Sequence, residues 1–164
     1  MVLGVFSLSA YTILHVVICF IAIGTGFVVV FGMLAKKRLD GWTFWFLLFT
    51  ALTNLTGFGF PFDHLLPSHF LGIFSMLATL VAILARYMFD MQGAWRRPYV
   101  IAATIALWTN MFALVAQSFG KIPALNALAP TQSEPPFLIA ELVMLTVFVV
   151  LGVGAVRQFH PAAT

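Results

Sequence analysis

Residues 108–117 read WTNMFALVAQ and place two amides, Asn110 and Gln117, inside a long apolar segment. Seven residues correspond to two turns of an α-helix, so both amides lie on the same helix face. A membrane-spanning helix aims side-chain amides at other protein groups or at water, because lipid offers them no hydrogen-bond partner. The stretch therefore predicts a membrane bundle with a polar interior that receives these two side chains.

The composition assigns the whole chain to the membrane class. Of its 164 residues, 62% are hydrophobic and 8% are charged, whereas soluble domains carry about 25% charged residues. At about 20 residues per span, the length suits a single transmembrane domain over residues 1–164. The single cysteine, Cys19, excludes an internal disulfide and a multi-cysteine metal site. The net charge of +3 arises from basic residues at span ends, so no nucleic-acid partner is expected.

Five apolar segments are expected to cross the lipid bilayer as helices, which makes the fold class all-α. Basic residues, tryptophans and prolines mark their ends, and the segments cover residues 9–34, 42–60, 68–91, 98–119 and 137–156. Between the last two, Pro123 and Pro130 bracket a short helix that is expected to lie on the membrane surface.

The basic residues predict the orientation of the five spans. Those that fall on one side are Lys36, Lys37, Arg38, Arg86, Arg96, Arg97 and Arg157. Of the Lys and Arg residues, only Lys121 falls on the other side. This positive-inside bias predicts an N-terminus outside the cell and a C-terminus in the cytoplasm. At the inner end, the i, i+4 spacing of Arg86 and Asp90 predicts a structural ion pair.

Polar side chains recur on helix faces that also carry small residues, and small residues mark helix contacts within membranes. At about 1.5 Å per residue, these polar groups fall in the outer half of the predicted bundle, with Asn110 the deepest. We expect them to line an outward-facing pocket that apolar packing closes below. The candidate ligand-binding residues are His15, Asn54, His69, Asn110, Gln117 and Glu141.

His15 and Glu141 are the most costly of these groups, because an unpaired ionisable side chain in a membrane costs about 3 kcal/mol or more. If the two meet, they form a pair that either locks two helices together or handles protons. With His64 and His69 they also offer nitrogen and oxygen ligands to a metal ion. His15 and His69 are further candidates for the axial ligands of a b-type haem.

Two stretches, GFGFP at residues 57–61 and LAPTQSEPPF at residues 128–137, resemble uncharacterised small inner-membrane proteins of bacteria. This resemblance spans most of the chain and implies a multi-pass protein of the bacterial plasma membrane, without an activity. Five spans in this length are also similar to the tryptophan-rich sensory proteins, whose members bind porphyrins and sterols. That similarity is one of architecture, since the tryptophan-rich motifs are missing, and it implies an apolar ligand.

Three functions are open at this point. The first is a binding protein that holds a metal, a haem or a small molecule at the polar site, in redox or proton-coupled work. The second is a transporter of small molecules or ions that uses the same residues transiently. The third is an accessory subunit of a membrane complex or a homo-oligomer, in which the polar groups join helices. No catalytic motif decides whether the chain is an enzyme.

Overall fold

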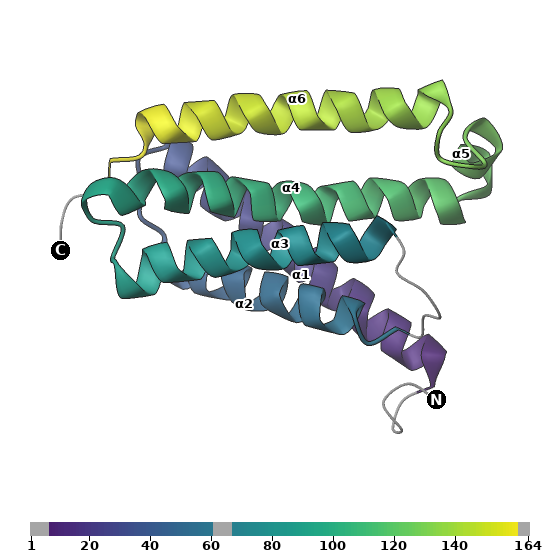
Figure 1. The fold of residues 1–164 in the computed structure, drawn as a ribbon, viewed down its shortest axis with the longest axis horizontal. Helices are drawn as coiled ribbons and strands as arrows, with labels where there is room; N and C mark the ends of the chain where they lie inside the picture. The colour runs from purple at the N-terminus through teal and green to yellow at the C-terminus, as the bar shows by residue number, and fades with distance from the viewer. Residues whose placement is uncertain (1–6, 61–66, 161–164) are drawn as a thin grey trace.

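The computed structural model describes residues 7–60 and 67–160, and the regular structure within these ranges is helical. The long helices are α1 (Leu8–Leu34), α2 (Asp40–Gly57), α3 (Pro67–Ile83), α4 (Arg96–Lys121) and α6 (Pro135–Gln158). They pack lengthwise into one elongated bundle (Figure 1). The expected all-α fold is confirmed.

Four helical segments are long and apolar enough to cross a membrane: Leu8–Leu34, Ser68–Met88, Gly93–Lys121 and Pro135–Gln158. The segment expected at 42–60 forms α2, which has 18 residues and is more polar, with Asp40 in its first turn and Asn54 near its end. Its length of about 27 Å falls slightly short of the apolar core of a bilayer, about 30 Å. Length and composition therefore identify four of the five expected spans.

Helix α4 is central to the bundle, because it packs against α1, α3 and α6 and also touches α2 over a short stretch. Its neighbours also pair with one another, α1 with α2 and α2 with α3. Phe46 of α2 and Leu107 of α4 are completely buried where these helices meet, and Tyr99 is almost so. The core thus surrounds α4 and includes buried residues of all five long helices. Helix α6 covers α4 from one side and is the most exposed of the four apolar segments.

The segment between α4 and α6 contains the short helix α5 (Pro123–Leu128), which confirms the helix expected between the two prolines. Two side-chain amides tie this segment to the end of α4. Asn126 donates to the carbonyl of Phe119 at 3.2 Å, and Gln132 donates to the carbonyl of Ala116 at 2.7 Å. The segment is therefore fixed on the end of the bundle.

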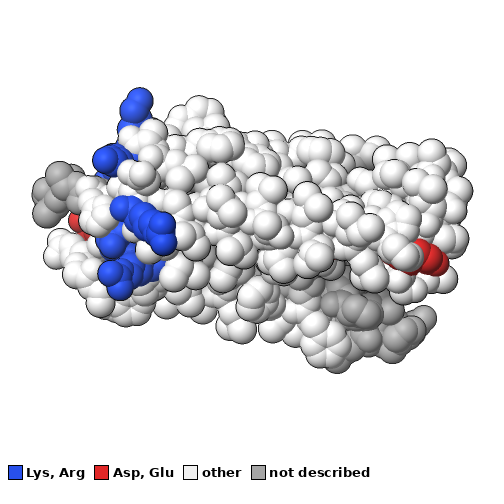
Figure 2. Space-filling model, turned by 90° about the horizontal axis from the view of Figure 1, so that it is seen from above, with Lys and Arg blue, Asp and Glu red and all other residues white. Residues whose placement is uncertain are grey.

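On the face seen in Figure 2, the lysine and arginine side chains gather at one end of the bundle, while Lys121 ends α4 at the other. This end combines the α1–α2 and α3–α4 connections with the C-terminus of α6. Arg38 of the first connection binds Asp90 of the second, and Arg96 at the start of α4 donates to the carbonyls of Val156 and Phe159. The charge segregation expected from the sequence is thus present in the folded chain.

Helices α1, α2 and α4 meet closely at Gly26 of α1. A Cβ added at Gly26 would lie 2.6 Å from Leu107 Cδ1 and 2.8 Å from Phe46 Cε2, both on fully buried side chains. We expect Gly26→Ala to lower the free energy of unfolding by about 1–3 kcal/mol, the usual cost of overpacking a core. A thermal melt in detergent measures this.

Gly24 provides the matched control on the same helix, because a Cβ added there meets nothing within 4 Å. Gly24→Ala is expected to leave the melting temperature unchanged or to raise it slightly, since alanine favours a helix over glycine by about 1 kcal/mol. Equal melting temperatures for both variants would contradict the close crossing at Gly26.

Candidate functional site

Two of the expected site residues, Asn54 and Asn110, are buried and join helices to one another. Asn54 Nδ2 donates to Thr79 Oγ1 at 3.3 Å, which ties α2 to α3. Asn110 Nδ2 donates to Thr50 Oγ1 at 3.3 Å, which ties α4 to α2. These amides therefore act as interhelical contacts, as buried amides in membrane proteins often do.

A third bond completes this layer, since Thr109 Oγ1 donates to Ser75 Oγ at 2.8 Å and joins α4 to α3. The sequence interpretation missed these hydroxyl partners. The available signal was their spacing: Ser75 and Thr79 are four residues apart on one helix face, as are Thr50 and Asn54. The buried polar layer consists of Thr50, Asn54, Ser75, Thr79, Thr109 and Asn110.

His15 lies between α1 and α2. Its Nδ1 is 2.7 Å from Thr56 Oγ1 and its Nε2 is 3.4 Å from Cys19 Sγ. Thr56 Oγ1 already donates its hydrogen to the carbonyl of Leu52, so it accepts from His15. Nδ1 therefore carries a proton, and Nε2 faces the Cys19 thiol. Phe60 packs edge-on against the ring, with the centroids 5.2 Å apart.

The remaining expected residues do not join His15 in one cluster. His69 is buried near the first turn of α3, with its ring centroid 5.9 Å from that of Phe58. Gln117, on the same face of α4 as Asn110, has an exposed side chain. His64 lies outside the described residues. Of the residues expected to line one pocket, Asn54 and Asn110 are thus hydrogen-bonded inside the bundle, whereas His69 and Gln117 lie apart from them nearer its outer end.

Glu141 of α6 differs from all of these residues. It is 9% exposed, and neither Oε1 nor Oε2 has a hydrogen-bond partner among the described residues. His15 binds Thr56 and Cys19 instead, so the conditional His15–Glu141 pair does not form. A buried carboxylate without a partner is strongly unfavourable, and a neutral carboxylic acid is the less costly form.

The surroundings of Glu141 follow from the way α6 packs on α4. The rings of Phe119 and Phe137 meet near one end, 5.4 Å apart, and Thr104 lies against Gly152 near the other. The two helices are therefore antiparallel, and the same register holds at both contacts. This register brings Glu141 to the level of Val115. Val115 packs against both apolar clusters of the bundle, so α4 is apolar at the level where Glu141 is buried.

A group that the sequence interpretation recognised only in part lies at the basic end. The expected Arg86–Asp90 ion pair is confirmed at 3.0 Å. Asp90 also pairs with Arg38 at 2.6 Å, and Asp40 pairs with Arg38 at 2.9 Å and with Arg86 at 2.6 Å. We refer to Arg38, Asp40, Arg86 and Asp90 as the ionic cluster. The hydrogen bond to Asp90, with a contribution from Asp40, raises the pKa of Arg38 above its ordinary value, although burial opposes this.

The backbone around the ionic cluster is irregular. Arg86 lies in a π-helical turn, Leu84–Met88, that ends α3. Asp90 and Met91 follow with φ values of 45° and 57°, in the left-handed region that costs a residue other than glycine about 1–2 kcal/mol. The two ion pairs of Asp90 offset this strain, so the cluster and the turn hold each other in place.

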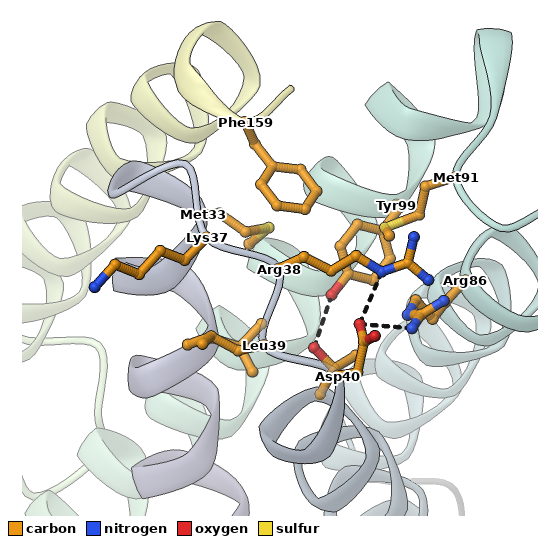
Figure 3. Close-up of a pocket in the computed structure, with 11 residues that line it drawn as sticks. Met33, Lys37, Arg38, Leu39, Asp40, Arg86, Met91, Tyr99 and Phe159 are labelled. Carbon is orange, nitrogen blue, oxygen red and sulfur yellow. Dashed lines mark hydrogen bonds and ion pairs between the residues drawn. The ribbon is translucent and has the colours of Figure 1, made fainter. Parts of the chain in front are cut away.

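A hollow of about 210 Å³, open mouth included, borders the ionic cluster (Figure 3). Arg38, Asp40 and Arg86 form its polar side, and the side chains of Met33 and Phe159 form its apolar side. The Tyr99 hydroxyl lies 3.3 Å from Thr43 Oγ1 at its base. This hollow lies at the basic end, whereas the sequence interpretation expected a cavity at the opposite end.

The described ranges contain no group of three or more His, Cys, Asp and Glu residues that could hold a metal ion. In the structure the ring nitrogens of His15 lie 2.7 Å from Thr56 Oγ1 and 3.4 Å from Cys19 Sγ, so neither faces a second histidine. No protein family, curated protein or solved structure matches the chain.

Proposed function

We propose that the chain is a proton-binding protein of a bacterial plasma membrane, in which the carboxyl of Glu141 takes up the proton. The observation that carries this proposal is the burial of both Glu141 oxygens without a partner. Buried ionisable groups are rare within membranes because their burial lowers the stability of the fold. Those that are present are therefore functional candidates. Proton-coupled work by a small membrane protein requires a group of this kind.

The proposed topology has five spans, with the N-terminus outside and the C-terminus in the cytoplasm. Four apolar segments and the position of α2 between α1 and α3 support five crossings. The basic end supports the orientation, since positive residues favour the cytoplasmic side. The resemblance to small bacterial inner-membrane proteins supports the choice of membrane. In this topology Glu141 lies in the outer half of the bundle.

The test is an infrared spectrum of the protein in liposomes. We expect the carbonyl band of a protonated carboxylic acid at neutral pH, because Glu141 is neutral, and we expect Glu141→Gln to remove it. Absence of the band from the unaltered protein, or its persistence in Glu141→Gln, would refute the proposal.

Glu134, just before α6, provides the control. Although desolvation acts in the opposite direction, hydrogen bonds from the Thr131 hydroxyl and the amides of Thr131 and Ser133 hold the pKa of Glu134 below its ordinary value. It is therefore ionised at neutral pH and contributes no acid band. Glu134→Gln is expected to leave the spectrum in that region unchanged.

A second candidate function is that of an accessory subunit in a larger membrane complex. The observation that favours it is the buried polar layer, whose amides and hydroxyls are engaged with one another and join α2, α3 and α4. In this case Glu141 meets a donor on a partner helix. Copurification of the tagged chain from membranes with one stoichiometric partner, lost in Glu141→Gln, would favour this function.

A further inference from the structure

At the basic end, some cations pair with acidic side chains and others do not. Asp40 and Asp90 are engaged by Arg38 and Arg86 within the ionic cluster. The guanidinium of Arg96 donates hydrogen bonds to two backbone carbonyls at the end of α6. The described residues provide no acidic partner for the exposed cations that remain, which are Lys36, Lys37, Arg97 and Arg157.

Three of these cations surround the contact between α1 and α6. A Cβ added at Gly154 would lie 2.9 Å from Leu34 Cδ2, so the two helix ends touch. Lys36 and Lys37 come two and three residues after Leu34, and Arg157 lies in the last turn of α6. The bonds of Arg96 to this end of α6 hold the position of Arg157.

The turn that carries the two lysines has a fixed geometry. The Lys36 amide donates to the Met33 carbonyl at 3.1 Å, and the Lys37 amide donates to the Gly32 carbonyl at 2.9 Å. With Lys36 at φ 60°, this pattern is a Schellman cap, in which glycine is usual at the left-handed position. In Figure 3 the Lys37 side chain extends away from the hollow, whereas that of Arg38 reaches toward Arg86.

An apolar surface continues from these cations along the seam between α1 and α6. Phe31 is 54% exposed and stacks on Phe27, with the centroids 6.0 Å apart. Phe27 in turn contacts Phe148 of α6 at 6.1 Å. A row of cations above an exposed aromatic surface is complementary to a molecule with an anionic head and an apolar tail.

We infer that the α1–α6 seam binds an anionic phospholipid, with its phosphate held by Lys36, Lys37 and Arg157 and its acyl chain lying along Phe31. Basic residues at the cytoplasmic surface of membrane proteins attract anionic headgroups with about 1 kcal/mol each. The inference requires that the basic end lies at a membrane surface. It does not depend on the protonation of Glu141, and the two are tested separately.

The experiment is native mass spectrometry of the full chain in detergent, titrated with phosphatidylglycerol or phosphatidylcholine. We expect phosphatidylglycerol to bind and phosphatidylcholine to bind at least tenfold more weakly. Inorganic phosphate serves as the headgroup without chains and is expected not to compete. Equal binding of both lipids, or displacement by equimolar phosphate, would overturn the inference.

The variants remove charge without disturbing the turn. Lys36→Gly suits the positive φ of that residue, and Lys37→Gln and Arg157→Gln are exposed changes. Each is expected to weaken phosphatidylglycerol binding about fivefold, and the triple variant about 100-fold. Circular dichroism of each single variant checks folding, so a misfolded triple variant leaves the test intact.

Lys121, the last residue of α4, and Arg97, in its first turn, are the matched controls at the opposite end and at the same end. Lys121→Gln and Arg97→Gln are expected to change the affinity less than twofold, because neither residue lies at the α1–α6 seam. A loss in Lys121→Gln or Arg97→Gln as large as that in Lys37→Gln would show a diffuse attraction by net charge and would overturn the assigned site.

Discussion

Arg86→Met is expected to lower the free energy of unfolding by about 2–3 kcal/mol, one of the largest losses from a single change in this chain. The Arg86 side chain is 10% exposed and binds two carboxylates. Removing one partner of a fully buried ion pair costs about 3–5 kcal/mol. The expected loss is smaller because the side chains of Asp40 and Asp90 are 55% and 35% exposed to solvent, and because both keep Arg38 as a partner.

Methionine preserves most of the volume of the arginine stem, so the loss reports the charge rather than a cavity. Thermal unfolding in detergent, followed by circular dichroism, measures it. Arg97→Met is the control at the same end, since Arg97 is exposed and unpaired within the described ranges. It is expected to change the stability by less than about 0.5 kcal/mol. Equal losses for the two variants would contradict the role of the ionic cluster.

A double-mutant cycle separates the ion pair from the general loss of a residue. Asp90→Asn alone removes a partner of both Arg38 and Arg86 and leaves the strained φ of Asp90 without its ion pairs. We expect Arg86→Met and Asp90→Asn together to cost at least about 1 kcal/mol less than the sum of the single changes, because they share one network. Simple additivity would show that the two residues act independently.

The local features of the bundle were predictable from the sequence. Proline spacing indicated α5, and the i, i+4 spacing indicated the ion pair between Arg86 and Asp90. Both depend on neighbours in the chain, so periodicity and helix-end signals suffice. The polarity of α2 is also visible in the sequence, although its apolar centre gave the impression of an ordinary span.

The site could be predicted less well, because a helix face does not reveal which helix it meets. Asn110 and Gln117 share a face of α4, yet Asn110 meets Thr50 while Gln117 is exposed, since α2 and α4 touch over a short stretch. The sequence left open whether His15 meets Glu141 of α6, and in the structure His15 contacts Thr56 of α2. Arg38 and Asp40 joined Arg86 through two loops whose proximity arises only in the folded chain.

Glu141→Arg is the second change with a large expected effect. The guanidinium remains charged in proteins, so an arginine at this position cannot become neutral as a carboxylic acid can. At a buried position where the carboxyl has no hydrogen-bond partner among the described residues, it is expected to cost about 3 kcal/mol or more. We expect a melting temperature far below that of the unaltered protein, or failure to accumulate in the membrane.

Two further replacements at the same position decide what the loss means. Glutamine copies the shape of a protonated glutamate and is expected to keep the stability within about 1 kcal/mol, and leucine, which has no polar group to bury, is expected to equal or exceed the unaltered protein. A neutral, buried carboxyl therefore predicts a definite order of stability. The leucine variant equals or exceeds the unaltered protein, the glutamine variant lies close to it, and the arginine variant lies far below all three. An arginine variant as stable as the unaltered protein would mean that water or an acidic group reaches this position. Glu141 would then be free to ionise, and the proton-binding proposal would lose its physical basis.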